Sequence, residues 1–185
     1  RDLYSDLSNK KSLPVLPFSD NRLVNLLNHT FWFLPSISSC NAMKNLMMKR
    51  ANYFYHDYEI IVCAGNAVGT GVEAIKPIRI KMSNPLSSKT ITLSCGKLNT
   101  GVTIKPWSGV FFLRDTESPE TYFQTAFRVQ SPWQIPDKDN NSINLKEECF
   151  IFDFSPNRAL KLLTEYSLRL DISDKEHEEK IENVI

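Results

Sequence analysis

The sequence is poor in the residues that common catalytic and metal-binding motifs need: it has four cysteines, three histidines and six glycines. No C-x-x-C pair occurs, which argues against zinc and disulfides and predicts buried free thiols in a reducing compartment. No G-x-S-x-G motif occurs and the histidines are scattered, so a serine hydrolase is not indicated. A Cys95–His56 nucleophile pair is conceivable, but a lone cysteine at the end of a strand usually serves packing.

Long apolar runs and a charge of one sign are also missing. The longest apolar runs are too short to span a bilayer, and no signal peptide opens the chain. The net charge of +1 does not indicate any class of binding partner, so a surface that binds nucleic acid would have to be a local patch of basic residues. The length of 185 residues suits one domain. Because the chain begins with Arg1, we expect a fragment of a longer, cytoplasmic polypeptide.

A phosphate-binding loop is absent as well. Gly96-Lys97 would need a glycine at position 91, which is Ile91, and Leu98 replaces the Ser/Thr that would hold magnesium. The glycines of the stretch 65–71 (GNAVGTG) do not have the G-x-G-x-x-G spacing, which favours a connecting loop over a phosphate cradle. The chain is therefore not expected to bind or hydrolyse ATP by itself.

Strand and helix patterns alternate along the chain. Alternation of this kind predicts an α/β fold with a mostly parallel sheet, helices on both faces and right-handed crossovers. We expect a lead-in over residues 1–24, a domain over 25–170, an acidic tail over 171–185 and a polar loop over 134–148. The predicted strands are 30–34, 58–63, 90–95, 108–113 and 149–154, and the predicted helices are 21–28, 40–54, 72–82, 119–129 and 157–168.

The parallel sheet predicts where a ligand site would lie. Ligands of such sheets bind at the carboxyl ends of the strands. The loops after Leu34, Cys63, Cys95 and Leu113 would then share one edge. Asp115 follows an apolar strand as a metal-holding carboxylate can, but without a phosphate loop it is interpreted as a loop or cap residue.

The stretch 90–133 concentrates the polar chemistry of the chain. Gln124 and Arg128 are four residues apart on one predicted helix, so both project from the same face. An arginine in this position could stabilise charge on a transferring phosphoryl group. An ion pair with Asp115 or Glu120 is the alternative, and residue types alone favour it.

Three segments resemble motifs of superfamily-2 helicases of the DEAD/DEAH type, in the form found in restriction–modification motor subunits. Residues 97–106 (KLNTGVTIKP) look like motif V, 124–131 (QTAFRVQS) like motif VI, and 30–36 (TFWFLPS) like motif IV. The resemblance covers about residues 25–170 and implies the second RecA-like domain, a three-layer fold that here lacks its own Walker A loop.

The resemblance also implies roles for single residues. Arg128 would be the arginine finger for ATP, Gln124 would help to position it, and Gly101 and Thr103 would lie on the nucleotide side. The residues implied for nucleic-acid phosphates are Thr100, Lys97 and Ser36. Phosphate contacts of this kind position the strand and do not read its sequence.

Two positions depart from the family pattern. Thr103 replaces the aspartate of motif V, and Ser131 replaces the second arginine of motif VI. Either this branch works with one arginine, or its use of ATP is degraded. The first option is favoured because the rest of the helix is intact.

The function implied is that of the C-terminal motor domain of an ATP-dependent helicase or translocase in a restriction or phage-defence enzyme. ATP and Mg²⁺ would be held mainly by an N-terminal RecA-like domain of the same polypeptide. The other partners would be DNA, with RNA left open, and a linked nuclease or methyltransferase. A non-catalytic RecA-like scaffold or interaction module is the alternative. A flavodoxin-like nucleotide-binding domain is a third reading, weakened because the stretch 35–39 has no glycine.

Overall fold

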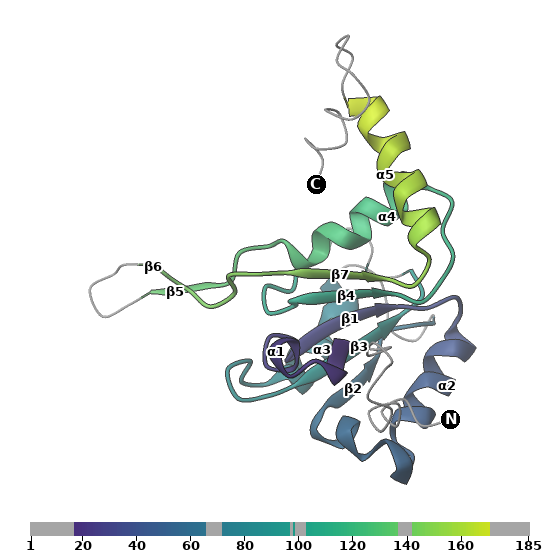
Figure 1. Ribbon diagram of the computed structural model, residues 1–185. Helices are drawn as coiled ribbons and strands as arrows, with labels where there is room; N and C mark the ends of the chain where they lie inside the picture. Colours follow the sequence, from purple (N-terminus) through teal and green to yellow (C-terminus); the bar gives the residue numbers. More distant parts are fainter. Residues whose placement is uncertain (1–16, 66–71, 97, 99–102, 137–141, 171–185) are drawn as a thin grey trace.

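The computed structural model of the protein describes residues 17–65, 72–96, 98, 103–136 and 142–170 (Figure 1). Its centre is a sheet of five parallel strands in the order β2-β3-β1-β4-β7. The strands are β1 (His29–Phe33), β2 (Glu59–Val62), β3 (Thr90–Ser94), β4 (Gly109–Phe112) and β7 (Phe150–Asp153). The prediction of a parallel sheet is confirmed.

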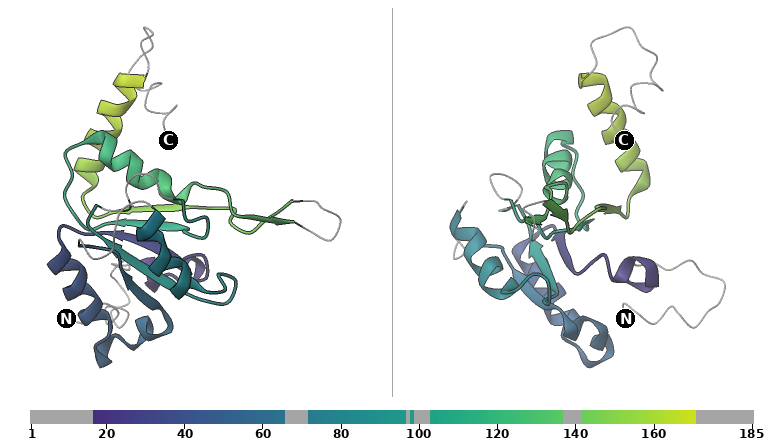
Figure 2. Two further views of the ribbon diagram at one scale, coloured as in Figure 1. Left: turned by 180° about the vertical axis from the view of Figure 1, so that it is seen from behind. Right: turned by 90° about the vertical axis from the view of Figure 1, so that its left-hand side faces the viewer.

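Helices cover both faces of this sheet. One face carries the 3₁₀ helix η2 (Pro17–Ser19), α1 (Asn21–Val24), α2 (Ile37–Met47) and the 3₁₀ segment η3 (Arg50–Asp57). The other face carries α3 (Val72–Met82), α4 (Pro119–Ala126), its 3₁₀ extension η5 (Phe127–Val129) and α5 (Pro156–Leu170). Figure 2 shows α1 and α3 on opposite sides of the sheet. The predicted three-layer α/β fold class is confirmed. None of the helices in the described ranges is both long and apolar enough to cross a membrane.

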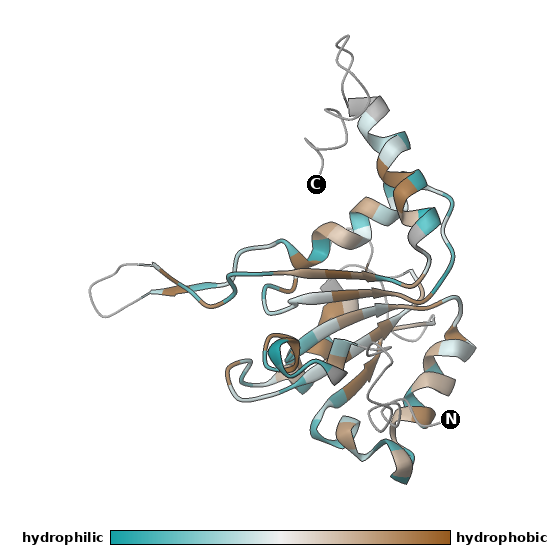
Figure 3. Cartoon of the chain, in the orientation of Figure 1, coloured by the Kyte–Doolittle hydropathy of each residue, from teal (hydrophilic) through white to brown (hydrophobic). Residues whose placement is uncertain are grey.

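The central strands are buried on both faces because both faces are covered by helices. All five residues of β1 are buried, and Figure 3 shows the sheet interior as largely hydrophobic. Successive side chains of β1 point to opposite faces. Phe31 therefore stacks on Trp107 in one core at a centroid distance of 4.8 Å, and Trp32 stacks on Phe111 in the other at 4.7 Å.

The strands end at the same level. Phe33, the last residue of β1, pairs with Ser94 at the end of β3 and with Phe112 at the end of β4. The carboxyl ends therefore form one edge, which faces right in Figure 1 beside α2 and α5. The predicted shared edge exists, although most of the loop after Cys63 and part of the loop after Cys95 lie outside the described residues.

The segment predicted as a polar loop, residues 134–148, contains an antiparallel hairpin instead. Its strands are β5 (Gln134–Pro136) and β6 (Ser142–Asn144), and Gln134 pairs with Asn144. The hairpin arm projects from the edge of the sheet opposite α2 and α5 (Figure 1). Each strand is only three residues long and mostly exposed, so the hydrophobic pattern could not reveal it.

Several helix boundaries differ from the predicted ones. The helix predicted over residues 21–28 is the four-residue α1, while Val72–Met82 forms as predicted with Pro77 inside it. The helix predicted from Cys40 begins earlier, at Ile37, because Ser36 is its N-cap: the hydroxyl oxygen of Ser36 accepts a hydrogen bond from the amide of Ser39 at 3.1 Å.

The cysteines confirm the predicted buried thiols only in part. All four are free, but Cys149 is exposed and Cys95 is half-buried. Burial raises the pKa of Cys40 to about 12 and that of Cys63 to about 11, so both remain protonated thiols at neutral pH.

Candidate functional site

Arg128 lies at the end of the helix that connects β4 to β7. Ser118 caps this helix, because its hydroxyl oxygen accepts a hydrogen bond from the amide of Thr121 at 3.2 Å, and Pro119 occupies the first turn. A crossover helix between parallel strands runs back toward their amino ends. Its last turn tightens into η5, so Arg128 lies near the amino end of the sheet and not at its carboxyl edge. This placement departs from the general expectation for ligand sites in parallel sheets.

The two candidate side chains of this helix differ in exposure. Gln124 is exposed, whereas Arg128 is half-buried. Burial lowers the pKa of Arg128 from its ordinary value of 12.5, but a guanidinium stays charged at neutral pH. A half-buried cation beside an exposed amide can receive an anion presented by another domain.

Lys146 joins the turn after Arg128 to the segment before β4. Its ammonium donates hydrogen bonds to three backbone carbonyl oxygens: that of Val129 at 2.7 Å, Trp107 at 2.8 Å and Lys105 at 2.9 Å. Burial lowers the pKa of Lys146 to about 8. The segments predicted to resemble motifs V and VI therefore meet at one nitrogen atom. Sequence reasoning missed Lys146, which lies in the stretch predicted as a loop.

Thr103 lines an open groove of about 550 Å³ next to this junction. The groove runs between the end of α3, with Arg79 and Met82, and the side chain of Trp133. Thr103 itself is exposed. The structure thus places Thr103 on an accessible surface, with a basic and an aromatic side chain among its neighbours.

A second cavity of about 270 Å³ lies between α1, the amino end of the sheet and the hairpin arm. It is lined by His29, Ser108 and Lys146 among others. His29 is buried, and its Nδ1 and Nε2 lie 2.9 Å from Thr90 Oγ1 and 2.8 Å from the carbonyl oxygen of Pro85. Because a carbonyl can only accept, Nε2 carries a proton, and burial lowers the pKa of His29 from its ordinary 6.5, which favours the neutral imidazole at neutral pH. His29 is therefore a structural histidine.

Ser36 lies at the opposite edge, directly after β1. Its side chain is exposed, and its hydroxyl oxygen lies 2.8 Å from that of Ser39 while it caps α2. Ser36 and Arg128 are therefore at opposite ends of the strands. The structure does not bring them into one site.

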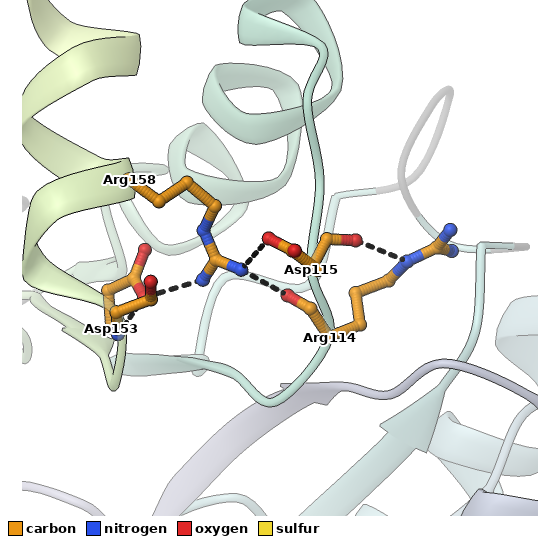
Figure 4. Close-up of polar contacts among 5 residues, drawn as sticks. Arg114, Asp115, Asp153 and Arg158 are labelled. Atoms are coloured by element: carbon orange, nitrogen blue, oxygen red, sulfur yellow. Dashed lines mark hydrogen bonds and ion pairs between the residues drawn. The ribbon is translucent and has the colours of Figure 1, made fainter.

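Asp115 is held by Arg158 of α5 (Figure 4). The same guanidinium donates to Asp153 at 2.6 Å and to the carbonyl oxygen of Arg114 at 3.2 Å. This network links the ends of β4 and β7, and the guanidinium lowers the pKa of Asp115. Asp115 is thus an ion-pair residue of a loop. No group of three or more His, Cys, Asp or Glu side chains that could hold a metal occurs in the described ranges.

Arg114 is a basic residue at the carboxyl edge that sequence reasoning missed. Its guanidinium carbon lies 4.9 Å from the ring centroid of Phe33, and its Nη1 donates to the carbonyl oxygen of Cys95 at 3.4 Å. The residue thus bridges the ends of β1, β3 and β4. The available signal was an arginine directly after the apolar run of residues 110–113.

Three predicted site residues, Lys97, Thr100 and Gly101, lie outside the described residues. Their neighbour Leu98 is buried in the core shared with α3 and α4. The predicted roles of these three residues remain predictions.

Comparison with known proteins finds a relative in Mycoplasma pneumoniae. A Mycoplasma pneumoniae protein, provisionally named as the C-terminal part of the type II restriction enzyme and methyltransferase RM.MpnORF110P, is 34% identical over 149 residues. The chain is similar to the C-terminal part of a restriction–modification protein. The match includes 80% of this chain but spans only 20% of that relative's length. No family model matches the chain.

Among solved structures, the C-terminal part of the Fun30 ATPase domain matches with a TM-score of 0.48 at 14% identity. The match covers 71% of this chain and 36% of that one. Identity this low carries no residue roles across. The predicted resemblance to restriction–modification proteins is confirmed by the Mycoplasma relative.

Proposed function

We propose that this chain is the second motor domain of an ATP-dependent helicase or translocase that belongs to a restriction–modification enzyme. The relative supports the restriction–modification context, and the parallel α/β fold is the one that the motif pattern implies. In this proposal the chain supplies an arginine finger and part of the nucleic-acid track, and it is not an ATPase alone.

The convergence of two segments at Lys146 is the observation that carries the proposal. The segment 103–107 and the turn after Arg128 are about twenty residues apart in sequence, yet their carbonyl oxygens bind the same nitrogen. A motor domain needs these two segments side by side, because together they form its wall of the nucleotide cleft. In the proposal, Arg128 and Gln124 serve catalysis and Gly101 and Thr103 face the nucleotide.

ATP and Mg²⁺ would be bound mainly by another RecA-like domain of the same polypeptide. The chain fits this division because it carries a half-buried guanidinium and no phosphate-binding loop. Arg128 would meet the negative charge of the transferring phosphoryl group and lower the barrier electrostatically. The enzyme would act on DNA in the cytoplasm, with a nuclease or methyltransferase on the same polypeptide.

Nucleic-acid contacts are proposed for the other side of the domain. Ser36 lies exposed at the carboxyl edge, and the same role is proposed for Lys97 and Thr100, which lie outside the described residues. In this proposal, ATP and nucleic acid bind at different places on the domain, so the domain can contact both at the same time. The contacts would go to phosphates, so the track would not depend on sequence.

A second candidate function is a non-catalytic scaffold. Thr103 and Ser131, which stand where the family has an aspartate and an arginine, favour it. In that case the fold would be kept for docking alone.

Steady-state ATPase measurements on the full-length enzyme separate the two functions. The motor predicts hydrolysis that nucleic acid stimulates and that Arg128→Ala abolishes. The scaffold predicts that any hydrolysis by the full-length enzyme is the same with Arg128→Ala as without it.

A further inference from the structure

We propose that Lys146 is a positioning residue for Arg128: its ammonium fixes the turn that carries the guanidinium against the segment before β4. The inference rests on the proposed function, because it assigns Lys146 a place in the same site. Lys146 touches neither nucleotide nor nucleic acid in this proposal and acts only through Arg128.

The ammonium group of Lys146 donates all of its hydrogen bonds to backbone carbonyl oxygens. An ammonium has three N–H donors and no acceptor. All three find carbonyl oxygens between 2.7 and 2.9 Å away, on Val129, Trp107 and Lys105. Carbonyl oxygens are fixed by the chain, unlike carboxylates on flexible side chains. A cation bound in this way restrains backbone at three points.

Two of these points are rigid. The side chains of Val129 and Trp107 are fully buried in the core that packs against α3 and α4. Val129 directly follows Arg128, so restraining the carbonyl of Val129 restrains the backbone from which the guanidinium projects. The backbone position of Arg128 is thereby tied to the start of β4.

The helix end explains why a cation is suited to this place. The last carbonyl groups of a helix have no partner within the helix, and they carry the negative end of its dipole. The last turn of α4 has no basic side chain, and that of η5 has Arg128. Lys146 supplies a further donor from a distant segment, and its bond to the carbonyl oxygen of Val129 caps the end of η5.

The hairpin arm brings Lys146 to this position. Asn144 ends β6, and the amide of Leu145 donates to the carbonyl oxygen of Trp133 at 2.8 Å. This bond fixes the chain one residue before Lys146 to the residue that precedes β5. Hydrogen bonds from Leu145 and Lys146 therefore hold the base of the hairpin arm against the turn after Arg128.

Single-turnover ATP hydrolysis by the full-length enzyme, with nucleic acid present, tests the inference. Lys146→Met keeps the length of the side chain and removes its donors, and we expect it to slow hydrolysis by about 10-fold or more, with nucleotide affinity unchanged. Lys161→Met removes an exposed lysine of α5 and serves as the matched control, with an expected rate equal to the wild type. Lys146→Arg keeps a cation with several donors and should restore the rate to within about threefold.

Arg128→Ala measured in parallel separates this inference from the proposed function. If Lys146 acts through Arg128, the double variant is no slower than Arg128→Ala alone. If Arg128→Ala hydrolyses ATP at the wild-type rate, the proposed function fails. If Arg128→Ala is slow but folded Lys146→Met is at the wild-type rate, only the inference on Lys146 is overturned. Should Lys146→Met not fold, Lys146→Ala, which also removes every N–H donor of the side chain, replaces it, and a wild-type rate there overturns the inference equally.

Discussion

The ammonium nitrogen of Lys146 lies 2.7 Å from the carbonyl oxygen of Val129. This contact links the exposed hairpin arm to the residue after Arg128, and so it connects a segment without any recognisable motif to the proposed arginine finger. The two flanking contacts, to Trp107 and Lys105, extend the link to the segment before β4. The amino edge of the sheet is thereby a single packed unit.

Acid is expected to destabilise the domain through His29. Burial lowers the pKa of His29 from its ordinary 6.5, so the unfolded chain binds a proton that the folded chain does not. The contribution of neutral His29 to the free energy of unfolding is fully present above pH 6.5, and it is lost as the pH falls toward the lowered pKa of His29 in the folded state. Between these two pKa values, the free energy of unfolding should fall by at most about 1.4 kcal/mol for each pH unit.

Urea unfolding at a series of pH values checks this expectation. In a plot of the free energy of unfolding against pH, the fall on the acid side (the acid limb) should be shallower for His29→Gln than for the wild type. His56→Gln, which changes an exposed histidine, should leave this acid limb unchanged. An acid limb of equal slope in His29→Gln and wild type would mean that His29 is not the group responsible.

The Arg158 network is expected to stabilise the carboxyl edge. Asp153 is only 7% exposed and Arg158 15% exposed, so removing the guanidinium leaves a carboxylate buried without its cation. Arg158→Ala should therefore lower the free energy of unfolding by about 3–5 kcal/mol. Adding Asp153→Asn should recover part of this loss, because the unpaired charge disappears.

The matched comparison is Arg22→Ala, which breaks an ion pair whose arginine is 89% exposed. Its unfolding curve should coincide with that of the wild type. Equal effects of Arg22→Ala and Arg158→Ala in urea titrations would contradict the account of a buried pair.

Much of the fold could be predicted from the sequence because the central strands are buried on both faces. Runs such as 31–34 and 110–113 are apolar throughout, and Ser118-Pro119 is a strong helix start, so these elements formed where expected. The hairpin arm could not be predicted in this way. Its strands are three residues long and mostly exposed, so no apolar alternation marks them.

Residues of the candidate site could be predicted from the sequence only where they belong to a recognisable motif. Gln124 and Arg128 follow from their spacing on one helix, and the structure places both on α4 and η5. Lys146 has no such pattern, because its partners are backbone carbonyls and any residue provides a carbonyl. Arg114 and Arg158 depend on which strand ends become neighbours, and that is a property of the strand order.

Gln124 offers a graded test of the proposed site. Its side chain is exposed four residues before Arg128, where it could hold the nucleotide or the finger. In the full-length enzyme, Gln124→Ala should lower kcat by about 10-fold, which is less than the loss expected for Arg128→Ala. Gln130→Ala removes an exposed glutamine beyond the helix and should leave kcat unchanged. Equal kcat values for the two glutamine variants would remove Gln124 from the site.

The central claim is that Arg128 reaches a nucleotide held by another domain, and single-turnover ATP hydrolysis by full-length Arg128→Ala tests it most directly. Nucleotide affinity is measured separately, and Arg50→Ala, an exposed arginine at the start of η3, is the control. The account predicts a loss of about 3–7 kcal/mol of transition-state stabilisation in Arg128→Ala and none in the control. Hydrolysis at the wild-type rate by Arg128→Ala, stimulated by nucleic acid as before, would contradict it.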